Sequence, residues 1–304
     1  MKQPTEKPTL PALPYIVKSK ARNVQVVKMN SASPKGWEQW GLLRTDAHHD
    51  NAHCDQWLEK KHLDEALKRN AFIIDNGDLF CAMQGKWDRR SDLSQCRPEH
   101  QEGRYLDALV ETAADFYAPY ANNIITMAHG NHETSILKHH ETDLTERLVE
   151  RLNTKAGSKI VAGGYSGWIR FMLGRGLQTQ SFRLFRHHGY GGGGPVTRGV
   201  IQTNRMGIYL PDADIVFTGH THDAWIMPIE RVRISKADVL TLDRAYHVRA
   251  PGYKEEYADG RGGFHIERGA PPKPRGAIWI RFYWDSHGGN DRRGRFAFEM
   301  VEAK

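Results

Sequence analysis

Short apolar runs that end abruptly in polar residues recur along the chain. Runs of this length, bounded by turn-forming residues, predict strands that are buried on both faces. Between them, apolar residues recur at helical spacing with Lys and Glu on the opposite side, which predicts amphipathic helices. Alternating strands and helices favour an α/β architecture with a partly parallel sheet. The predicted strands cover residues 40–44, 72–74, 123–127, 181–186 and 215–217, and the predicted helices cover residues 54–70, 105–117 and 141–153.

The two ends of the chain follow a different pattern from this alternating core. Residues 1–35 are rich in Pro, Lys, Thr and Ser, so we expect an extended or disordered arm there. Residues 36–304 are expected to form one domain, whose motif-bearing core covers residues 40–226. The C-terminal part, residues 227–304, combines strands with a surface excursion that is rich in Gly, Pro and charged residues. The excursion covers residues 250–275, and further strand-like runs lie at residues 24–28, 232–234, 239–242 and 277–284.

The composition of the chain limits the class of protein and its location in the cell. The chain of 304 residues can bury a sizeable core, with 39% hydrophobic and 26% charged residues. It contains no apolar run close to the roughly 20 residues that span a bilayer, and its N-terminus lacks the apolar segment of a signal peptide. The 3 cysteines form no disulfide framework, so we expect a reduced, cytoplasmic protein that contacts no membrane. The net charge of +7 makes nucleic acid a plausible partner.

Acidic, amide and imidazole side chains follow the predicted strands where the chain leaves the sheet. In open α/β sheets, ligands bind just beyond the carboxyl ends of the strands. Oxygen and nitrogen donors suit borderline or hard divalent metal ions, and we expect no cysteine to join them. We expect the i, i+2 pairs to lie in extended backbone, which points both side chains to the same side. The segments are Asp46-Ala47-His48, Gly77-Asp78, Gly130-Asn131-His132-Glu133, His187-His188-Gly189 and Gly219-His220-Thr221-His222.

The number of donors indicates more than one ion. Two Asp, one Asn and at least four His exceed a single tetrahedral site but suit two ions that share one carboxylate. Two-metal sites, with ions about 3.5–4 Å apart, stabilise both the attacking and the leaving oxygen in an in-line displacement at phosphorus. We expect two divalent ions, with Mn²⁺ first and Fe, Zn or Mg²⁺ as alternatives, because all of these accept such ligands.

This ordered set of motifs resembles the calcineurin-like metallophosphoesterase superfamily, whose pattern is DxH, GD, GNH[D/E], H and GHxH. The resemblance covers residues 40–226, and the HHGYGGGG segment before GHTH is most similar to phosphoesterases of bacteriophages and prophages. It implies a fold of two packed β-sheets flanked by α-helices, with a dinuclear metal site at strand ends. It also implies a hydrolase that acts on phosphoric ester bonds through a dinuclear metal centre and a metal-bound hydroxide.

The resemblance further implies a role for each matching residue. Asp78 would bridge the two ions. His132, which is not a ligand in this pattern, would protonate the leaving oxygen or steady the transition state. The first ion would be held by Asp46, His48, Asp78 and His222. The second ion would be held by Asp78, Asn131, His188 and His220.

Two assignments stay open at this point. His187 and His188 are adjacent and would face opposite ways in an extended segment, and we favour His188 because it directly precedes the glycine. Many members of the superfamily carry an aspartate three residues after the GD aspartate, as a partner of the catalytic histidine. Cys81 occupies that position here, which leaves Glu133 and Asp88 as candidate partners of that histidine.

Other polar residues near the motifs are expected to orient ligands or to lie at the surface. His49 and Asp50 directly follow the first motif and are candidates for orienting the ligands. The histidines on polar or helical stretches are expected at the surface. They are His53, His62, His139 and His140.

Three functions are consistent with this pattern. The first is a metal-dependent phosphoesterase that hydrolyses phosphomonoester or phosphodiester bonds. The second is a DNA or RNA nuclease of the same superfamily, which the net charge and the residues Trp87, Arg89 and Arg90 in a long polar loop favour. The third is a non-catalytic nucleic-acid-binding or scaffold protein with a retained metal site. Such a protein would be expected to lose ligands or the GNH histidine, and all of them are present.

Overall fold

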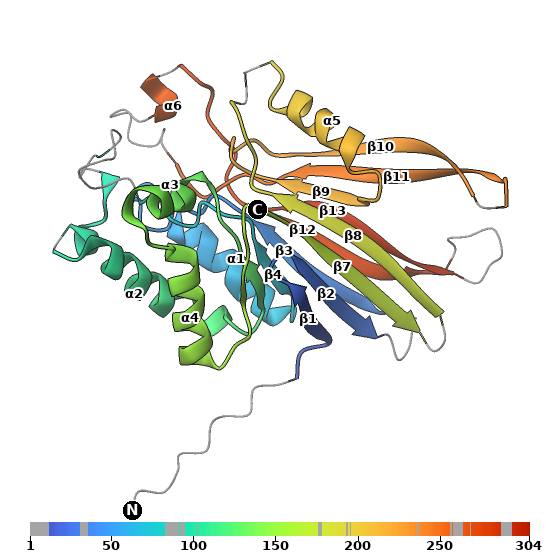
Figure 1. Ribbon diagram of the computed structural model, residues 1–304, viewed down its shortest axis with the longest axis horizontal. Coiled ribbons are helices and arrows are strands. Elements are labelled where there is room, and N and C mark those ends of the chain that lie inside the picture. The colour runs from blue at the N-terminus through green and yellow to red at the C-terminus, as the bar shows by residue number, and fades with distance from the viewer. Residues whose placement is uncertain are drawn as a thin grey trace, which may run out of the picture.

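Two β-sheets pack face to face, with helices on both outer sides of the pair (Figure 1). The computed structural model describes residues 12–30, 36–82, 91, 95–101, 103–175, 178–192, 194, 196–235, 237–255, 257, 264–267, 269–286 and 294–304. This arrangement confirms the expected α/β class and the two-sheet sandwich flanked by helices.

The six-stranded sheet is mostly parallel. β3 pairs in parallel with β4, β4 with β5 and β5 with β6, while β12 and β13 add antiparallel strands at one side. The polypeptide therefore leaves β3, β4 and β5 at the same end of the sheet. The strands are β3 (Glu38–Arg44), β4 (Phe72–Asp75), β5 (Ile124–Met127), β6 (Val161–Ala162), β12 (Ala277–Asp285) and β13 (Arg295–Ala303), in the order β13-β12-β3-β4-β5-β6.

The seven-stranded sheet mixes both directions. β8 and β9 are parallel neighbours, so their carboxyl ends also lie together. The strands are β1 (Tyr15–Ala21), β2 (Val24–Asn30), β7 (Ser166–Arg175), β8 (Gln178–His187), β9 (Ile215–Thr218), β10 (Trp225–Ile234) and β11 (Leu240–Arg249), in the order β1-β2-β7-β8-β9-β11-β10.

The helices divide between the two outer faces (Figure 1). α1, α2 and α4 pack their apolar sides on the six-stranded sheet, and α5 covers β8 and β9 of the other sheet. Among the described residues, no helix combines the length and the hydrophobicity needed to cross a membrane. The α-helices are α1 (Gln56–Lys68), α2 (Tyr105–Tyr117), α3 (Asn131–His140), α4 (Leu144–Ala156), α5 (Val200–Tyr209) and α6 (Phe264–Glu267), with 3-10 turns at Pro98–His100 and Ala118–Tyr120.

The inner core explains why β3, β4 and β5 read as continuous apolar runs. One set of their side chains faces the helices, and the alternate set faces the other sheet. Phe72 lies at the centre of the space between the sheets, fully buried, with its ring 5.2 Å from that of Phe171 and 5.9 Å from that of Tyr15. Both faces of these strands are therefore fixed, which holds their carboxyl ends in place.

The N-terminal segment corrects one expectation. Residues 1–35 were expected to form an extended or disordered arm with a strand-like run at 24–28. That run is confirmed as part of β2, but β1 was not expected, and the two strands form a hairpin at the edge of the seven-stranded sheet. The reason is burial: Tyr15, Val27 and Met29 contribute to the core between the sheets, while residues such as Ile16 and Lys28 on the opposite face are exposed. Residues 1–11 and 31–35 lie outside the described residues.

The expected surface excursion also begins inside the protein. Tyr253 is fully buried, and its hydroxyl lies 3.1 Å from Nδ1 of His62. The Tyr253 amide donates to the carbonyl of Asp46 (3.0 Å), so this segment packs against the first motif. His62, expected at the surface, is 2% exposed because this tyrosine covers it. The division of the chain into domains stays a prediction.

Candidate metal centre

The loops that follow the central strands of both sheets meet at one end of the sandwich. The amide of Asp46 donates to the carbonyl of Gly77 (2.9 Å), and the amide of Gly219 donates to the carbonyl of His188 (2.7 Å). The side-chain amide of Asn76 donates to the carbonyl of His187 (3.0 Å), which ties a loop of the six-stranded sheet to one of the seven-stranded sheet. Hydrogen bonds to the main chain thus bring motif segments from distant parts of the sequence together.

Two groups of carboxylate and imidazole side chains form at this junction. Within each group, one ligand atom per residue lies within 4.8 Å of the others. In the first group, Nε2 of His222 is 3.3 Å from Nε2 of His48 and 3.3 Å from Oδ1 of Asp46. In the second group, Nε2 of His188 is 3.1 Å from Oδ2 of Asp78. The groups are Asp46, His48 and His222, and Asp78, His188 and His220.

The two groups adjoin each other. Nε2 of His188 also lies 3.9 Å from Oδ1 of Asp46, so this ring is close to a carboxylate of each group. Asn131 begins α3 beside them, and the amide of the next residue, His132, donates to Oδ1 of Asp78 (2.9 Å). All the residues expected to act as ligands therefore come from one region. Their roles as ligands stay predictions.

Several atoms of these side chains are buried without a hydrogen bond. Among the described residues, these atoms include Oδ1 of Asn131. They also include Oδ1 of Asp46 and Nε2 of His188, whose neighbours are other carboxylate and imidazole groups of the centre. Leaving a buried polar group unpaired costs about 1–3 kcal/mol, so several in one place indicate a missing partner. Each of the three atoms can offer a lone pair to a cation. The residues present therefore fit divalent metal ions.

The backbone of the motifs differs from the expected extended conformation. Asp46 (φ 51°), His48 (φ 47°) and Asp78 (φ 50°) occupy the left-handed region, and so do His220 (φ 73°) and His222 (φ 55°). Residues other than glycine rarely adopt this conformation, which costs on the order of 1–3 kcal/mol each and concentrates at functional sites. Tight left-handed loops, rather than alternation along a strand, thus bring the i, i+2 side chains together.

Two motif glycines are required by close approach. A Cβ atom on Gly130 would lie 2.0 Å from Oδ1 of Asp78, and one on Gly219 would lie 2.4 Å from Oδ2 of Asp46. Any larger residue at either position would displace a carboxylate of the centre.

The charges of the centre favour cations. Burial alone would raise the pKa of Asp46, but His188 and His222 hold it below its ordinary value. Burial likewise opposes ionisation of Asp78, but His188 and His132 lower its pKa. Both carboxylates are therefore ionised at neutral pH. Two buried carboxylates surrounded by imidazoles attract divalent cations, whose charge would balance that of the carboxylates.

The structure separates the two adjacent histidines. His188 is fully buried beside Asp78, and its Nδ1 lies 2.9 Å from the carbonyl oxygen of Asn76, which leaves Nε2 to face the carboxylates. His187 points elsewhere: its Nδ1 accepts from the amide of Gly189 (3.0 Å) and its ring packs on Tyr165. The geometry thus favours His188 as the ligand.

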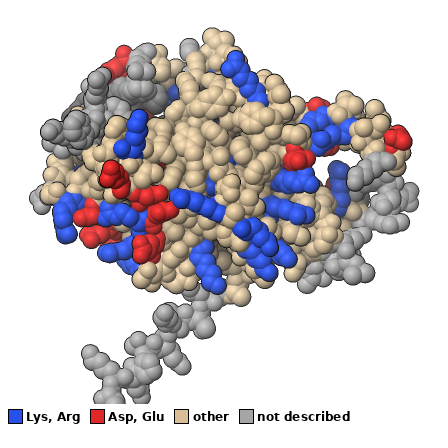
Figure 2. Space-filling model, viewed as in Figure 1, with Lys and Arg blue, Asp and Glu red and all other residues tan. Residues whose placement is uncertain are grey.

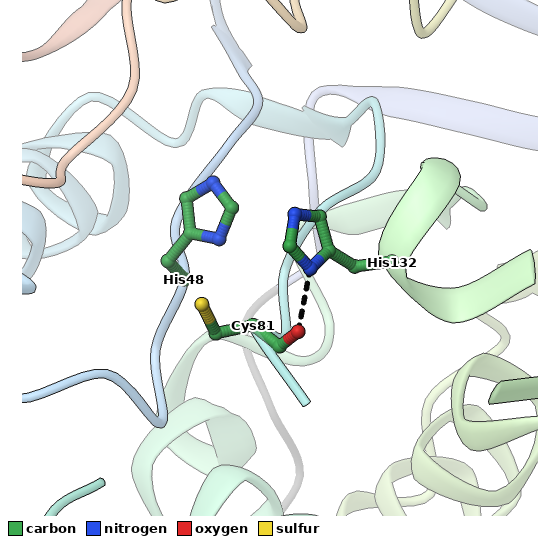
Figure 3. A group of neighbouring side chains, drawn as sticks. All are labelled: His48, Cys81 and His132. Carbon is green, nitrogen blue, oxygen red and sulfur yellow. Dashed lines mark hydrogen bonds between the residues drawn. The ribbon is translucent and has the colours of Figure 1, made fainter. Parts of the chain in front are cut away.

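His132 has a partner that the sequence did not suggest. Its Nδ1 lies 2.5 Å from the carbonyl oxygen of Cys81 (Figure 3). Of the candidates from the sequence, Glu133 instead accepts from the amides of Asp78 (3.1 Å), Phe80 (2.9 Å) and Gly130 (2.8 Å). Asp88 lies outside the described residues, as do Trp87, Arg89 and Arg90. A main-chain carbonyl leaves no trace in the side-chain pattern, so no sequence signal could have identified it.

Cys81 itself lies closer to the centre than expected. Its Sγ is within 4.8 Å of ring nitrogens of His48 and His132, on the side of His48 in Figure 3. Burial raises the pKa of this thiol to about 12, and the side-chain amide of Asn51 donates to the sulfur (3.2 Å). With this pKa, the residue is a thiol at neutral pH in the metal-free protein.

A buried ion network lies behind the first motif. Arg44, the last residue of β3, bonds Glu59 of α1 (2.7 Å) and Asp75 of β4 (3.0 Å), and all three side chains are almost fully buried. Glu59 also contacts Nδ1 of His49 (3.1 Å) and the hydroxyl of Tyr117. His49 directly follows His48, so this network connects a candidate ligand loop to the helices.

Comparisons with known proteins identify no family. No family model matches the chain, and no curated protein matches it. A solved structure of GAP50 from Plasmodium is similar over 88% of this chain and 85% of its own, with 11% identity and a TM-score of 0.44. Vps29 from Entamoeba histolytica, in complex with zinc, is similar over 88% of this chain and 100% of its own, with 11% identity and a TM-score of 0.36.

A third solved structure is that of an uncharacterized protein from Streptococcus pneumoniae, described as a predicted phosphoesterase. It is similar over 88% of this chain and 91% of its own, with 10% identity and a TM-score of 0.33. At this level of similarity, none of the three structures assigns a function to the chain.

Proposed function

We propose that this protein is a metal-dependent phosphoesterase that hydrolyses phosphomonoester or phosphodiester bonds at a dinuclear centre. The observation that carries the proposal is the pair of adjoining carboxylate–imidazole groups, with buried ligand atoms that lack hydrogen bonds. One ion would be held by Asp46, His48, Asp78 and His222, and the other by Asp78, Asn131, His188 and His220. Asp78 would then bridge the two ions, and the closeness of the two groups supports this, because Nε2 of His188 lies 3.1 Å from Asp78 and 3.9 Å from Asp46.

Each part of the proposed mechanism assigns a task to a residue of the chain. Two divalent ions, when bound, would supply Lewis acidity and a water molecule of lowered pKa. Asp46 and Asp78 would hold the ions as ionised carboxylates, for which their lowered pKa values prepare them. His132 carries the proton of Nδ1 toward the Cys81 carbonyl, so its Nε2 is free to exchange a proton with the leaving oxygen.

The test is hydrolysis of p-nitrophenyl phosphate and bis-p-nitrophenyl phosphate with added Mn²⁺. The wild-type chain should hydrolyse at least one of them, and His132→Ala should lose most of its activity on phenyl phosphate, whose leaving oxygen needs a proton. His139→Ala, an exposed histidine on the same helix, is the matched control and should leave turnover unchanged. Full metal occupancy without turnover on either ester would favour a non-catalytic binding or scaffold protein instead.

A second candidate, a DNA or RNA nuclease, is favoured by a row of cations on the seven-stranded sheet. Lys18 of β1 pairs in register with Val26, Val26 with Arg170 of β7, and Arg170 with Arg183 of β8. The three cations are exposed on the outer face, and Figure 2 shows Lys and Arg gathered over β1, β2, β7 and β8. β8 continues from Arg183 to His187 at the metal centre, roughly 13 Å away at the rise of a strand.

Charge reversal separates this candidate from a small-molecule esterase. Lys18→Glu combined with Arg170→Glu should weaken cleavage of single-stranded DNA or RNA and reduce its salt dependence, because each lost phosphate contact lowers the slope. Hydrolysis of bis-p-nitrophenyl phosphate should not change. Arg104→Glu combined with Lys159→Glu reverses the same charge outside this row and serves as the control. No cleavage of DNA or RNA by the wild type would exclude the nuclease.

The remaining assignments complete the proposal. The HHGYGGGG segment before GHTH supports a phosphoesterase of the bacteriophage and prophage type. All three cysteines are buried and free, which supports action in a reducing cytoplasm. Mn²⁺ is the first metal to test, with Fe, Zn and Mg²⁺ next.

A further inference from the structure

The main chain that holds His132 is itself held by an aspartate. Asp50 is 3% exposed, and its two carboxylate oxygens accept from consecutive amides: Oδ1 from Cys81 (2.5 Å) and Oδ2 from Ala82 (2.8 Å). The hydroxyl of Tyr105 donates to Oδ2 as well (3.2 Å). Ala82 is in the left-handed region (φ 46°), so the chain is bent tightly around this carboxylate.

One peptide unit joins Asp50 to His132. The amide of Ala82, which donates to Asp50, belongs to the same peptide group as the carbonyl of Cys81, which lies 2.5 Å from Nδ1 of His132. A trans peptide is planar, and its N–H and C=O point in opposite directions. Fixing the N–H on Asp50 therefore fixes the direction of the C=O. The carboxylate also polarises the peptide, which makes the carbonyl a stronger acceptor.

The carbonyl then decides which nitrogen of His132 carries the proton. A carbonyl oxygen can only accept, so Nδ1 must donate and the neutral ring keeps its lone pair on Nε2. Nε2 is therefore the nitrogen that takes up a proton from solvent and, as part of the imidazolium, gives it to the leaving oxygen. Nε2 lies 3.8 Å from Oδ2 of Asp78 and thus faces the metal centre. Figure 3 shows the ring of His132 standing over the Cys81 carbonyl with its other nitrogen directed away from it.

We propose that Asp50 is a positioning residue for His132, acting through the Cys81–Ala82 peptide. Many members of the superfamily that this chain resembles place a carboxylate directly on the catalytic histidine. Cys81 occupies that position here, and Asp50 would supply the carboxylate through the peptide instead. The inference deepens the proposed function and rests on it. Asp50 is placed for this task, because its carboxylate accepts from the two amides and Tyr105 and belongs to neither group of candidate ligands.

The first measurement needs neither metal nor activity. In the metal-free protein, nitrogen-15 NMR of the His132 ring should show the Nδ1–H tautomer in the wild type. Asp50→Asn, whose amide nitrogen cannot accept, should give a mixture of tautomers. A wild-type ring protonated on Nε2 alone would overturn the proposal without any variant, and so would an Asp50→Asn spectrum identical to that of the wild type.

The second measurement uses the leaving group. Phenolate needs a proton to leave and p-nitrophenolate does not, so loss of a general acid slows phenyl phosphate far more than p-nitrophenyl phosphate. Asp50→Asn should reduce kcat on phenyl phosphate about tenfold or more and kcat on p-nitrophenyl phosphate less than about threefold. His132→Ala should change the ratio of the two kcat values in the same direction and by a larger factor. Tyr105→Phe, which removes only the third bond to Asp50, should leave the ratio unchanged.

The outcomes separate this proposal from the proposed function. Equal slowing of both esters by Asp50→Asn would show a purely structural role and overturn the inference. If Asp50→Asn does not fold, Asp50→Glu keeps the charge and should show the same change of ratio in a milder form; an unchanged ratio would overturn the inference. If the wild type hydrolyses neither ester, the proposed function fails, while the tautomer measurement still decides the link between Asp50 and His132.

Discussion

Replacing Arg44 by methionine should destabilise the protein by about 3–5 kcal/mol, because it leaves two carboxylates buried without their cation. Glu59 and Asp75 are within 2.7 Å and 3.0 Å of the guanidinium, and both are at most 2% exposed. Methionine fills a similar volume, so the loss reflects charge rather than a cavity. For a domain of this size, the change corresponds to a fall in Tm of about 6–20 °C.

The cost of Arg44→Met in the free energy of unfolding should depend on pH. Burial would raise the pKa of Glu59, but Arg44 and then His49 lower it to about 2. This favourable contribution is present above pH 4.5, the ordinary pKa of the group, and is lost as the pH falls toward 2. Burial already raises the pKa of Asp75 to about 6 in the wild type. In Arg44→Met, the folded-state pKa of Glu59 rises above its unfolded value and that of Asp75 rises further, so the variant loses more stability than the wild type as the pH rises. The difference between wild type and variant should therefore grow from pH 4 to pH 7.

Urea denaturation at several pH values measures this difference directly. Arg147→Met is the matched control: it removes an arginine from an exposed pair with Asp107 and should cost less than about 1 kcal/mol at any pH. A cost below about 1 kcal/mol for Arg44→Met at pH 7, or one that does not change with pH, would refute the reasoning.

Three further predictions concern the core, a buried histidine and the centre. Phe72→Ala should cost about 3–5 kcal/mol in urea unfolding, because it empties the space between the sheets; a cost below about 1 kcal/mol would contradict the packing. Burial lowers the pKa of His62 to about 4, so its stabilising contribution is present above pH 6.5 and lost as the pH falls toward 4. His62→Gln should flatten the stability profile in that window, and an unchanged profile would argue against a buried neutral ring. Gly130→Ala should weaken Mn²⁺ binding seen by calorimetry, because its methyl group displaces Asp78, and unchanged affinity would contradict the geometry.

The sequence predicted correctly which motif residues lie together, but it predicted their local backbone conformation wrongly. Apolar runs identified β3, β4, β5, β8 and β9, because strands buried on both faces leave a continuous signal. The polar residues after these strands then predicted which side chains lie together at one end of the sandwich, since strand ends in such sheets converge. The two-sheet fold itself came from the resemblance, because periodicity alone does not specify how sheets pair.

The errors have physical causes of their own. The left-handed backbone at Asp46 and His48 was missed because side-chain spacing does not report φ. α3 was missed because its polar face dominates the sequence of residues 131–140, and β1 because an edge strand with one exposed face reads as a polar segment. The Asp50–Cys81–His132 connection was invisible, because it passes through a main-chain peptide.

The most direct test of the dinuclear centre is the number of ions bound per chain. Metal-free protein is titrated with Mn²⁺ by calorimetry, and the metal content is then measured after dialysis. The geometry predicts two ions per chain for the wild type and loss of both together in Asp78→Asn, because this carboxylate is shared. One ion per chain in the wild type, or one site unaffected by Asp78→Asn, would contradict the account.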